Sequence, residues 1–436
     1  MIGGVQNIGR ITELRQRILF TFGMLAVYRV GAFIVTPGID PDVVRNFFAQ
    51  MEGTVLGLFT LFSGGALEQL SIFSLGIMPY ISASIIFQLL TVVIPQLEEL
   101  KKEGEQGQRR INQLTRYATI GLALFQSALL AVALERGQFG AGAVIDPGWG
   151  FRLMCMITLT SGTAFIMWLG EQITERGIGN GISMVIFASI IISIPSAISN
   201  LIQLIQTDQF SLIQALFFLA LAVVVVFFVI IVERGQRRIP IQHARRVVGK
   251  RVQQGGMTYF PLRVNTSGVI PAIFASSLLM FPLTIGQFTD SPAVQGFIDT
   301  YLNPADFLYQ VVFIGLIIFF CYFYTAIMIN PADVAENIKR SGAYIPGIRP
   351  GKKTAEHIDR ILTRITLIGA IYMSAVCVLP TILAVRMGVP FYFGGTALLI
   401  VVGVGLDTIS QIEAHLVSRQ YEGLARGTRV RGRLQR

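Results

Sequence analysis

Long stretches without a charged residue constrain this chain more than any other feature of its sequence. A helix needs about 20 residues to cross the hydrocarbon core of a bilayer, and nine uncharged stretches are of that order. A tenth, Ile18–Val35, contains the single charge Arg29. The nine are Gln69–Leu97, Tyr117–Leu134, Leu153–Gly170, Gly177–Thr207, Gln209–Val232, Val264–Thr289, Phe307–Ala332, Ile365–Val385 and Met387–Leu406.

These stretches predict an all-α polytopic membrane protein with about ten transmembrane helices. A backbone in lipid must satisfy its N–H and C=O groups within its own segment, and a helix does so. Only 14% of the 436 residues are charged, whereas soluble domains carry roughly 25%. The three cysteines, Cys155, Cys321 and Cys377, lie in predicted spans without metal-ligand spacing, so we interpret them as packing residues.

The distribution of Lys and Arg predicts which side the loops face. With ten spans both termini lie on one side, and the loops of that side carry 29 of the 35 Lys and Arg residues. The opposite loops carry three, Arg45, Arg136 and Arg386. Because positive charge in short loops marks the cytoplasmic side, we expect both termini, including a basic tail over residues 418–436, to be cytoplasmic.

Two predicted cytoplasmic segments, about 233–263 and 330–360, are longer than the topology requires and are rich in Arg and Lys. Attraction to anionic lipid headgroups is one explanation. Pro, Gly and aromatic residues interleave with the charges, which favours shaped loops that contact a large anionic or acidic partner. Ribosomal RNA or an acidic protein surface would fit this description.

A short repeat divides the chain into two halves, residues 1–207 and 208–417, with five predicted spans each. The pattern G-x-x-P-x-I-x-A-S occurs at Gly76–Ser84 and again at Gly268–Ser276, near the start of the second span of each half. An odd number of spans per half predicts inverted repeats whose matching helices face a central pathway. Chance is the alternative, because Gly and Pro are frequent in membrane helices.

An apolar segment, Gly53–Leu67, is too short to cross a bilayer and is broken by Ser63-Gly64-Gly65. Irregular backbone at membrane depth is tolerated only where protein or a water-filled cavity surrounds it. We therefore expect this segment to fold into a central cavity.

The spans carry almost none of the residues that chemistry or ion coupling would need. Asp, Glu, Lys and His are nearly absent from them, which argues against an ion-driven solute transporter. Arg29 and Asp407 fit a structural ion pair or a headgroup contact. The motifs H-E-x-x-H and G-x-S-x-G are absent, and Gly347–Thr354 lacks P-loop spacing. The residues alone therefore predict an inverted-repeat membrane transport protein without a catalytic residue, metal or cofactor. A small-solute transporter is one alternative, disfavoured by the scarcity of buried charge, and an intramembrane enzyme is the other, which lacks every motif it would need.

Several strings of the sequence resemble one family along nearly the whole chain. They are Phe62–Leu67, Gly76–Ser84, Trp168–Gly181, Val232–Arg238, Gly268–Ala275, Pro346–Gly351 and Val389–Thr396. In these strings the chain resembles the SecY family, the channel-forming subunits of bacterial protein-export translocons.

The resemblance implies a channel that conducts unfolded secretory polypeptides across the bacterial cytoplasmic membrane, recognises signal peptides and releases membrane segments sideways into lipid. It implies SecE and SecG as partner subunits, and the SecA ATPase or a ribosome as the source of the driving force for translocation. The implied constriction is an apolar ring of Ile77, Ile81, Ile186, Ile273 and Ile400. Taken alone, an isoleucine in a membrane helix is a packing or lipid-facing residue, so only the resemblance selects these five.

The resemblance also implies a plug, a lateral gate and a docking surface. The plug covers about residues 53–70, with Phe62, Ser63, Gly64, Gly65, Ala66 and Leu67 at its centre. Ser82, Gln88, Gln126 and Asn265 are candidate gate residues, although ordinary interhelical hydrogen bonds explain such residues equally well. Arg238, Arg245, Arg246 and Arg349 are candidates for docking the motor or the ribosome, since arginine binds phosphate and carboxylate through two parallel hydrogen bonds.

Overall fold

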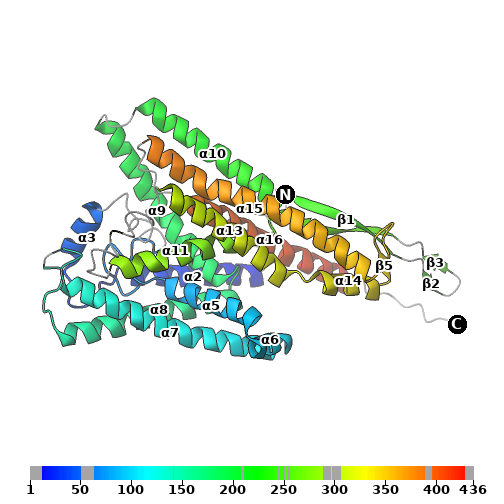
Figure 1. Ribbon diagram of the computed structural model, residues 1–436, viewed down its shortest axis with the longest axis horizontal. Helices are drawn as coiled ribbons and strands as arrows, with labels where there is room; N and C mark the ends of the chain where they lie inside the picture. The colour runs from blue at the N-terminus through cyan, green and yellow to red at the C-terminus, as the bar shows by residue number, and fades with distance from the viewer. Residues whose placement is uncertain are drawn as a thin grey trace. The chain divides into compact units, whose positions relative to one another are not determined.

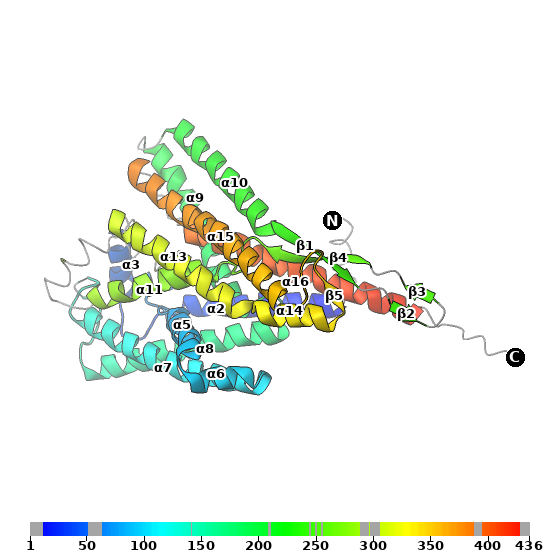
Figure 2. The ribbon, with the colours of Figure 1, turned by 45° about the vertical axis from the view of Figure 1, so that its right-hand side comes forward.

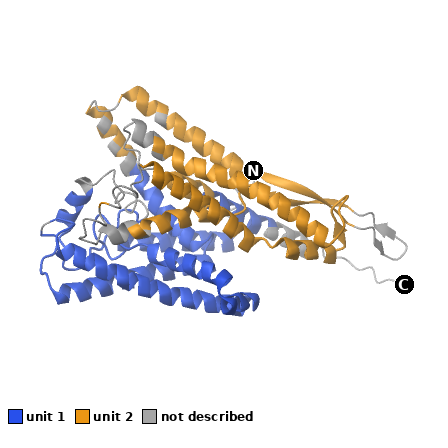
Figure 3. Ribbon diagram, in the orientation of Figure 1, with its two compact units in different colours: residues 1–196, 404–436 blue, residues 197–403 orange. Residues whose placement is uncertain are grey.

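A computed structural model describes residues 12–50, 63–140, 142–207, 211–243, 246–248, 251–253, 256–287, 296, 306–387 and 395–427. Helices dominate these residues (Figure 1). The chain forms two compact units, residues 1–196 with 404–436 and residues 197–403 (Figure 3). Helices α9 (Gly181–Gln206) and α16 (Gly395–Gly427) each run from one unit into the other. The two halves expected from the repeat stay a prediction.

The first unit contains most of the N-terminal helices. In it, α7 packs against both α5 and α8, and α2 packs against α8. Gly162 of α8 lies against the irregular segment before α5, because a side chain there would collide with the backbone of Ile72. Besides parts of α9 and α16, the helices are α2 (Thr12–Ala32), α3 (Pro41–Gln50), α5 (Met78–Val93), α6 (Pro95–Lys102), α7 (Glu105–Glu135) and α8 (Trp149–Arg176).

The second unit combines long apolar helices with a small sheet. Helix α13 packs against α11 and α15, and α14 packs against α15. Helix α10 exposes Phe217, Val224 and Phe228, as a helix in contact with lipid would. Besides parts of α9 and α16, the helices are α10 (Leu212–Arg234), α11 (Ile270–Gln287), α13 (Phe307–Met328), α14 (Pro331–Arg340) and α15 (Lys352–Met387).

The strands of the second unit form two antiparallel arrangements. One is a three-stranded sheet in the order β4-β1-β5, and the other is the hairpin β2-β3. Both views place the sheet beside α14 and the start of α15 (Figures 1 and 2). The predicted α-helical architecture is confirmed, and the strands are an addition to it. They are β1 (Gln236–His243), β2 (Arg246–Val248), β3 (Arg251–Gln253), β4 (Met257–Arg263) and β5 (Ala343–Tyr344).

Among the described residues, six helices are long and apolar enough to cross a membrane, or seven if the bent pair α5 and α6 forms one span. Two shorter apolar helical stretches, Gly181–Pro195 and Ile270–Met280, lie at predicted spans. The total of about ten spans stays a prediction. Cys155, Cys321 and Cys377 are buried free thiols, in agreement with a role in packing.

The stretch Gln69–Leu97, expected as one continuous span, is divided in the structure. Helix α5 begins only at Met78, and it meets α6 at an angle of 97°. Ile94 lies between the two helices in an extended conformation, with φ −97° and ψ 114°. Pro95 follows it, and the proline ring disfavours the helical conformation for the preceding residue. The bend therefore has a local cause in the sequence.

The two copies of the repeated motif adopt the same backbone conformation at their start. Gly76 has φ +57° and Gly268 has φ +62°. A helix then begins two residues later in each copy, at Met78 and at Ile270. Glycine adopts this left-handed conformation without the steric penalty that a Cβ atom brings. The repeated glycine is thus explained by the turn that precedes each helix.

We predict that Gly268→Ala destabilises the protein by about 1–2 kcal/mol, because alanine is strained in the left-handed region. The space around Gly268 is open, so a collision would not contribute. The matched control is Gly121→Ala in α7, where the space is also open and alanine favours the helix by about 0.5–1 kcal/mol. Thermal melting in detergent should show opposite shifts, and equal shifts would contradict the explanation.

Candidate functional site

Strands β1 and β4 form the framework of a basic surface in the second unit. They pair antiparallel, with Arg237 opposite Leu262 and Ile239 opposite Phe260. Successive side chains of a strand point to opposite faces, so Ile239 and Leu262 share a face, on which both are buried. Arg238 lies on the other face and is exposed. The alternation thus separates an apolar inner face from an outer face that carries a predicted docking residue.

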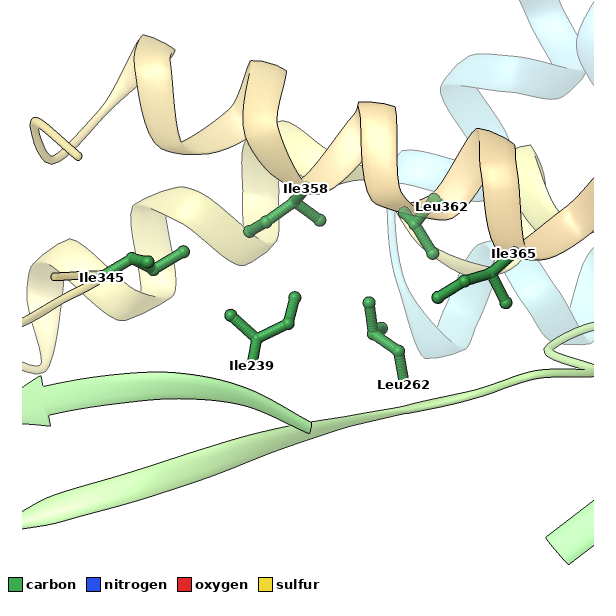
Figure 4. Packing of buried hydrophobic residues seen from close by; sticks show 6 residues of the cluster. All are labelled: Ile239, Leu262, Ile345, Ile358, Leu362 and Ile365. Atoms are coloured by element: carbon green, nitrogen blue, oxygen red, sulfur yellow. The ribbon is translucent and has the colours of Figure 1, made fainter. Parts of the chain in front are cut away.

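The inner face packs against α15 and the turn that precedes it. Six buried side chains form this core, in which residues from the strands point toward α15 (Figure 4). Strand β5 completes the sheet, with Gln242 opposite Tyr344 and His243 opposite Ala343. The core consists of Ile239, Leu262, Ile345, Ile358, Leu362 and Ile365.

We call this assembly the basic module and define it as residues 236–243, 256–263 and 331–365. It joins the two Lys- and Arg-rich segments that the sequence suggested separately. Their pairing through β1 and β5 and their shared core make them one folded body. The expectation of shaped loops is therefore confirmed for the described part of both segments.

Arg349 lies in the turn between β5 and α15 and is exposed. Two glycines with positive φ, Gly347 at +81° and Gly351 at +103°, shape this turn. The Thr354 hydroxyl donates a hydrogen bond to the Arg349 carbonyl oxygen at 3.0 Å, and Thr354 is 1% exposed. The backbone at Arg349 is thus held in place while its guanidinium faces outward.

Basic side chains gather at the N-terminus of α15. Lys352 and Lys353 are its first residues, and no acidic residue occupies its first turn. The helix dipole makes this end positive, so cations are unfavourable there. Glu356 offsets part of the charge by accepting a hydrogen bond from Lys353 at 3.0 Å, and this bond lowers the pKa of the Glu356 carboxyl. The end of α15 therefore attracts anionic groups.

The other predicted docking residues lie beyond the defined module. Arg246 belongs to β2, which pairs with β3 through Arg246 and Gln253. Arg245 lies outside the described residues. The docking role of all four arginines stays a prediction.

The five predicted ring isoleucines are all buried. Ile77, Ile81 and Ile186 belong to the first unit, whereas Ile273 and Ile400 belong to the second. In the second unit, a side chain at Gly403 would collide with Val269, so α16 closely approaches the residues that precede α11. Ile400 and Ile273 each lie about one turn from this approach. The ring as a whole stays a prediction.

The described end of the predicted plug lies against α9, which carries Ile186, and against the turn before α5. A Cβ on Gly64 would lie 3.1 Å from Ser189 Cα of α9, and one on Gly76 would lie 3.9 Å from Ser63 Cα. Residues 63–70 form turns, with Gly64 at φ +64° and Gly65 at φ +81°. Ala66 and Leu67 belong to the same turns, and Phe62 lies outside the described residues.

Residues of α2 contact the same segment. The Tyr28 hydroxyl donates a hydrogen bond to the Ser63 carbonyl oxygen at 3.1 Å, and Arg29 Nη1 donates one to the Gly64 carbonyl oxygen at 2.9 Å. Tyr28 also shares a 2.8 Å hydrogen bond with the Ser189 hydroxyl. Arg29 thus has a backbone hydrogen bond, where the sequence suggested an ion pair or a headgroup contact.

The predicted gate residues differ in how many of their side-chain donors and acceptors have a hydrogen-bond partner. The Asn265 amide donates to Glu233 at 2.7 Å and to the Gly268 carbonyl at 3.0 Å. Gln88 donates to Ser84 at 3.2 Å, while its buried carbonyl oxygen has no partner within the described part of the chain. Ser82 in α5 and Gln126 in α7 are half-buried. Their gate role stays a prediction.

Apolar helices, a repeated left-handed turn and a folded basic module define a polytopic membrane protein with a basic surface outside its apolar helices. The SecY family model matches residues 71–409. A protein translocase subunit SecY from Escherichia coli (strain K12) is 49% identical over 427 residues, which cover 97% of this chain and 96% of that protein. The corresponding subunit of Pseudomonas aeruginosa has the same identity and coverage. The chain therefore belongs to the SecY family.

Solved structures share the fold at low sequence identity. A structure described as a protein-conducting channel has a TM-score of 0.68 at 17% identity and covers 93% of both chains. Sec61 in a canine ribosome–channel complex has a TM-score of 0.64 at 16% identity, again with 93% of both chains covered. These similarities confirm the channel fold.

Sequence reasoning missed Tyr28 and Ser189. A tyrosine and a serine in apolar helices carry no distinguishing signal, and the two residues are far apart in the sequence. The charge of Arg29 marked α2 as unusual but did not reveal its partner. The Ser63-Gly64-Gly65 string was the most informative sequence feature of this region. Paired glycines permit a close approach of two backbones, and Gly64 closely approaches Ser189 of α9.

We predict that Ile358→Ala loosens the basic module. Ile358 is fully buried, and such a truncation costs about 2–5 kcal/mol. Because local opening exposes backbone next to the many Arg and Lys residues, trypsin should cleave the module faster in membrane-embedded protein. Met257→Ala on β4 is the control, since Met257 is 57% exposed. Equal cleavage of the two variants would contradict the proposed core.

Proposed function

We propose that this chain is the pore subunit of a protein translocase. It conducts unfolded secretory polypeptides across the bacterial cytoplasmic membrane and releases membrane segments into lipid through a lateral gate. The observation that carries the proposal is the 49% identity over 97% of the chain to a protein translocase subunit. The chain is a passive channel, and the SecA ATPase or a ribosome supplies the drive.

The proposed constriction is the ring of Ile77, Ile81, Ile186, Ile273 and Ile400. An apolar ring can lose its water and thereby block ions, while flexible side chains close around a moving polypeptide of any sequence. The match of residues 71–409 to the SecY family supports the ring. The segment 53–70 acts as the plug, and the contacts that its described residues make with α9 and with the turn before α5 support this role.

The lateral gate involves Ser82, Gln88, Gln126 and Asn265. A buried acceptor without a partner is unfavourable, so the free oxygen of Gln88 supports a site where a peptide or a neighbouring helix donates a hydrogen bond. Signal peptides are the proposed ligands of this gate. Both termini face the cytoplasm, in agreement with the excess of Lys and Arg on that side.

The basic module is the proposed docking surface for SecA and the ribosome. Its exposed Arg238 and Arg349, together with the positive end of α15, suit an anionic or acidic partner. Two structural neighbours are described as ribosome complexes, canine Sec61 and the yeast Ssh1 complex on the 80S ribosome. SecE and SecG complete the translocase, and anionic lipids contact the remaining basic residues.

We predict that a stalled precursor crosslinks to the ring. Single cysteines at Ile77, Ile81, Ile273 and Ile400, in a background without Cys155, Cys321 and Cys377, should each capture the precursor in reconstituted membranes. Cysteines at the exposed α10 residues Val224 and Phe228 are the controls and should not. If the precursor reaches none of the ring positions while SecA and SecE are present, the channel proposal fails and a small-solute transporter is favoured.

We predict that Arg349→Glu reduces SecA-driven translocation by tenfold or more. A charge-assisted hydrogen bond contributes about 1.5–3 kcal/mol, and reversing the charge also adds repulsion from an acidic partner. Arg340→Glu is the matched control within the module, because Arg340 is exposed and its charge is already offset by Glu336 at 2.6 Å. The melting temperature should be unchanged for Arg349→Glu and slightly lower for Arg340→Glu, which loses its ion pair and places two carboxylates four residues apart on α14. Equal losses of translocation would contradict a specific role for Arg349.

A further inference from the structure

Three buried groups meet where the plug segment lies against α2 and α9. The exposed fractions are 2% for Tyr28, 5% for Ser63 and 0% for Ser189. The Tyr28 ring stacks on Phe73, with centroids 5.8 Å apart, so its hydroxyl position is fixed. That hydroxyl lies 3.1 Å from the Ser63 carbonyl oxygen and 2.8 Å from the Ser189 hydroxyl.

Three hydrogen-bond contacts meet at this point, but only two hydroxyl protons are available for them. The Ser189 hydroxyl also contacts the Val185 carbonyl oxygen at 2.9 Å. Tyr28 and Ser189 each have one hydroxyl proton to donate, yet three contacts join them to each other and to the Ser63 and Val185 carbonyls. One contact must therefore lack a proton at any moment.

The arrangements of the protons in which both hydroxyls donate are of two kinds, which differ in the acceptor that Tyr28 uses. In the first, Tyr28 donates to the Ser63 carbonyl while Ser189 donates to Tyr28 or to Val185. In the second, Tyr28 donates to Ser189 and Ser189 donates to Val185, so that neither hydroxyl needs Ser63. The second arrangement lets the segment at Ser63 depart without leaving a buried O–H group unpaired, which would be costly.

Neighbouring contacts keep the segment close to these hydroxyls. Arg29 donates to the Gly64 carbonyl oxygen at 2.9 Å and lies 4.3 Å from the Phe33 ring centroid. Gly64 has a positive φ, and a Cβ there would lie 3.1 Å from Ser189 Cα. Successive carbonyls of the segment are thus bound by successive residues of α2.

We infer that Tyr28 and Ser189 form an exchangeable hydrogen-bond latch on the Ser63 end of the plug. Tyr28 donates a hydrogen bond to the plug in the closed channel, and Ser189 accepts that hydrogen bond when the plug leaves. Both are positioning residues, and Arg29 supports the closed position through Gly64. The inference rests on the proposed function, because it assigns to this segment the movement of a plug.

The latch predicts different effects for two conservative variants. Tyr28→Phe removes one hydrogen bond from each state, the bond to Ser63 in the closed channel and the bond to Ser189 in the open channel. The Ser63 carbonyl keeps the Ala66 amide as a donor at 3.3 Å, so the balance between the states changes little. Ser189→Ala keeps the Tyr28 bond to Ser63 but removes the acceptor that Tyr28 uses when the plug leaves, so opening leaves the Tyr28 hydroxyl unpaired and the closed channel is favoured. The double variant behaves like Tyr28→Phe, because no hydroxyl remains at position 28 that needs an acceptor. One hydrogen bond corresponds to about a three- to tenfold change in the ratio of open to closed channels.

The experiment measures single-channel open probability in planar bilayers. The full chain is reconstituted with its partner subunits, and opening is induced by a subsaturating synthetic signal peptide with a basic N-terminus and an apolar core. The ratio of open to closed channels should fall about three- to tenfold for Ser189→Ala, whereas Tyr28→Phe and the double variant should stay within about twofold of the unaltered channel. Equal melting temperatures of the variants and the unaltered protein exclude a folding defect.

Matched controls remove the same chemical groups elsewhere in the first unit. Tyr117 in α7 is 71% exposed, and the Ser161 hydroxyl in α8 bonds only within its helix, to Thr158, among the hydrogen bonds described for it. Tyr117→Phe and Ser161→Ala should leave the open probability unchanged.

The outcomes separate the latch from the proposed function. Ser189→Ala channels that open as readily as the unaltered channel, or a double variant that opens as rarely as Ser189→Ala, overturn the latch, while an unaltered channel that opens with the peptide still supports translocation. An unaltered channel that neither opens with the peptide nor passes a precursor overturns the proposed function, and the latch with it.

Discussion

The need to satisfy backbone hydrogen bonds away from water governs this structure. Helices meet the need within each apolar segment, but residues 63–76 are irregular and must find partners in the surrounding protein. They do so through the Thr36 amide bonded to Leu70 and the Ile72 amide bonded to Ile34, both at 2.9 Å, and through the Ser71 amide bonded to Ala66 at 2.9 Å. A segment that is held by hydrogen bonds to other segments can move when these bonds pass to other partners. A continuous helix keeps its hydrogen bonds within itself.

The charges follow from the same constraint. Arginine and lysine are costly in lipid, so a surface rich in them must be built outside the membrane helices and needs a core of its own. The basic module obtains this core from six buried side chains shared by β1, β4, α15 and the turn before it. A stable core holds Arg238 and Arg349 in fixed positions, which a flexible basic loop would not.

Features that depend on local pattern could be predicted from the sequence, whereas features that depend on distant pairing could not. Uncharged stretches located the helices, and the repeated glycines located two equivalent turns. Helix ends were less accurate, because α15 begins at Lys352 within a charged segment. The strands remained hidden, since β1 contains Pro240 and only Ile239 and Ile241 are buried in it. The hydrogen bond between Tyr28 and Ser189 joins residues 161 positions apart, and no periodicity marks it.

The basic module and the second repeated helix are physically continuous. Strand β4 ends at Arg263 and α11 begins at Ile270, and the connection between them is fixed on both sides. Asn265 bonds to Glu233 at the end of α10, and a Cβ on Gly369 of α15 would lie 2.9 Å from the Val264 carbonyl oxygen. Ile273 lies in the first turn of α11, where its amide bonds to Val269. The basic module and the helix that carries Ile273 are therefore joined along residues 264–269 by packed backbone and hydrogen bonds, as a rigid connection requires.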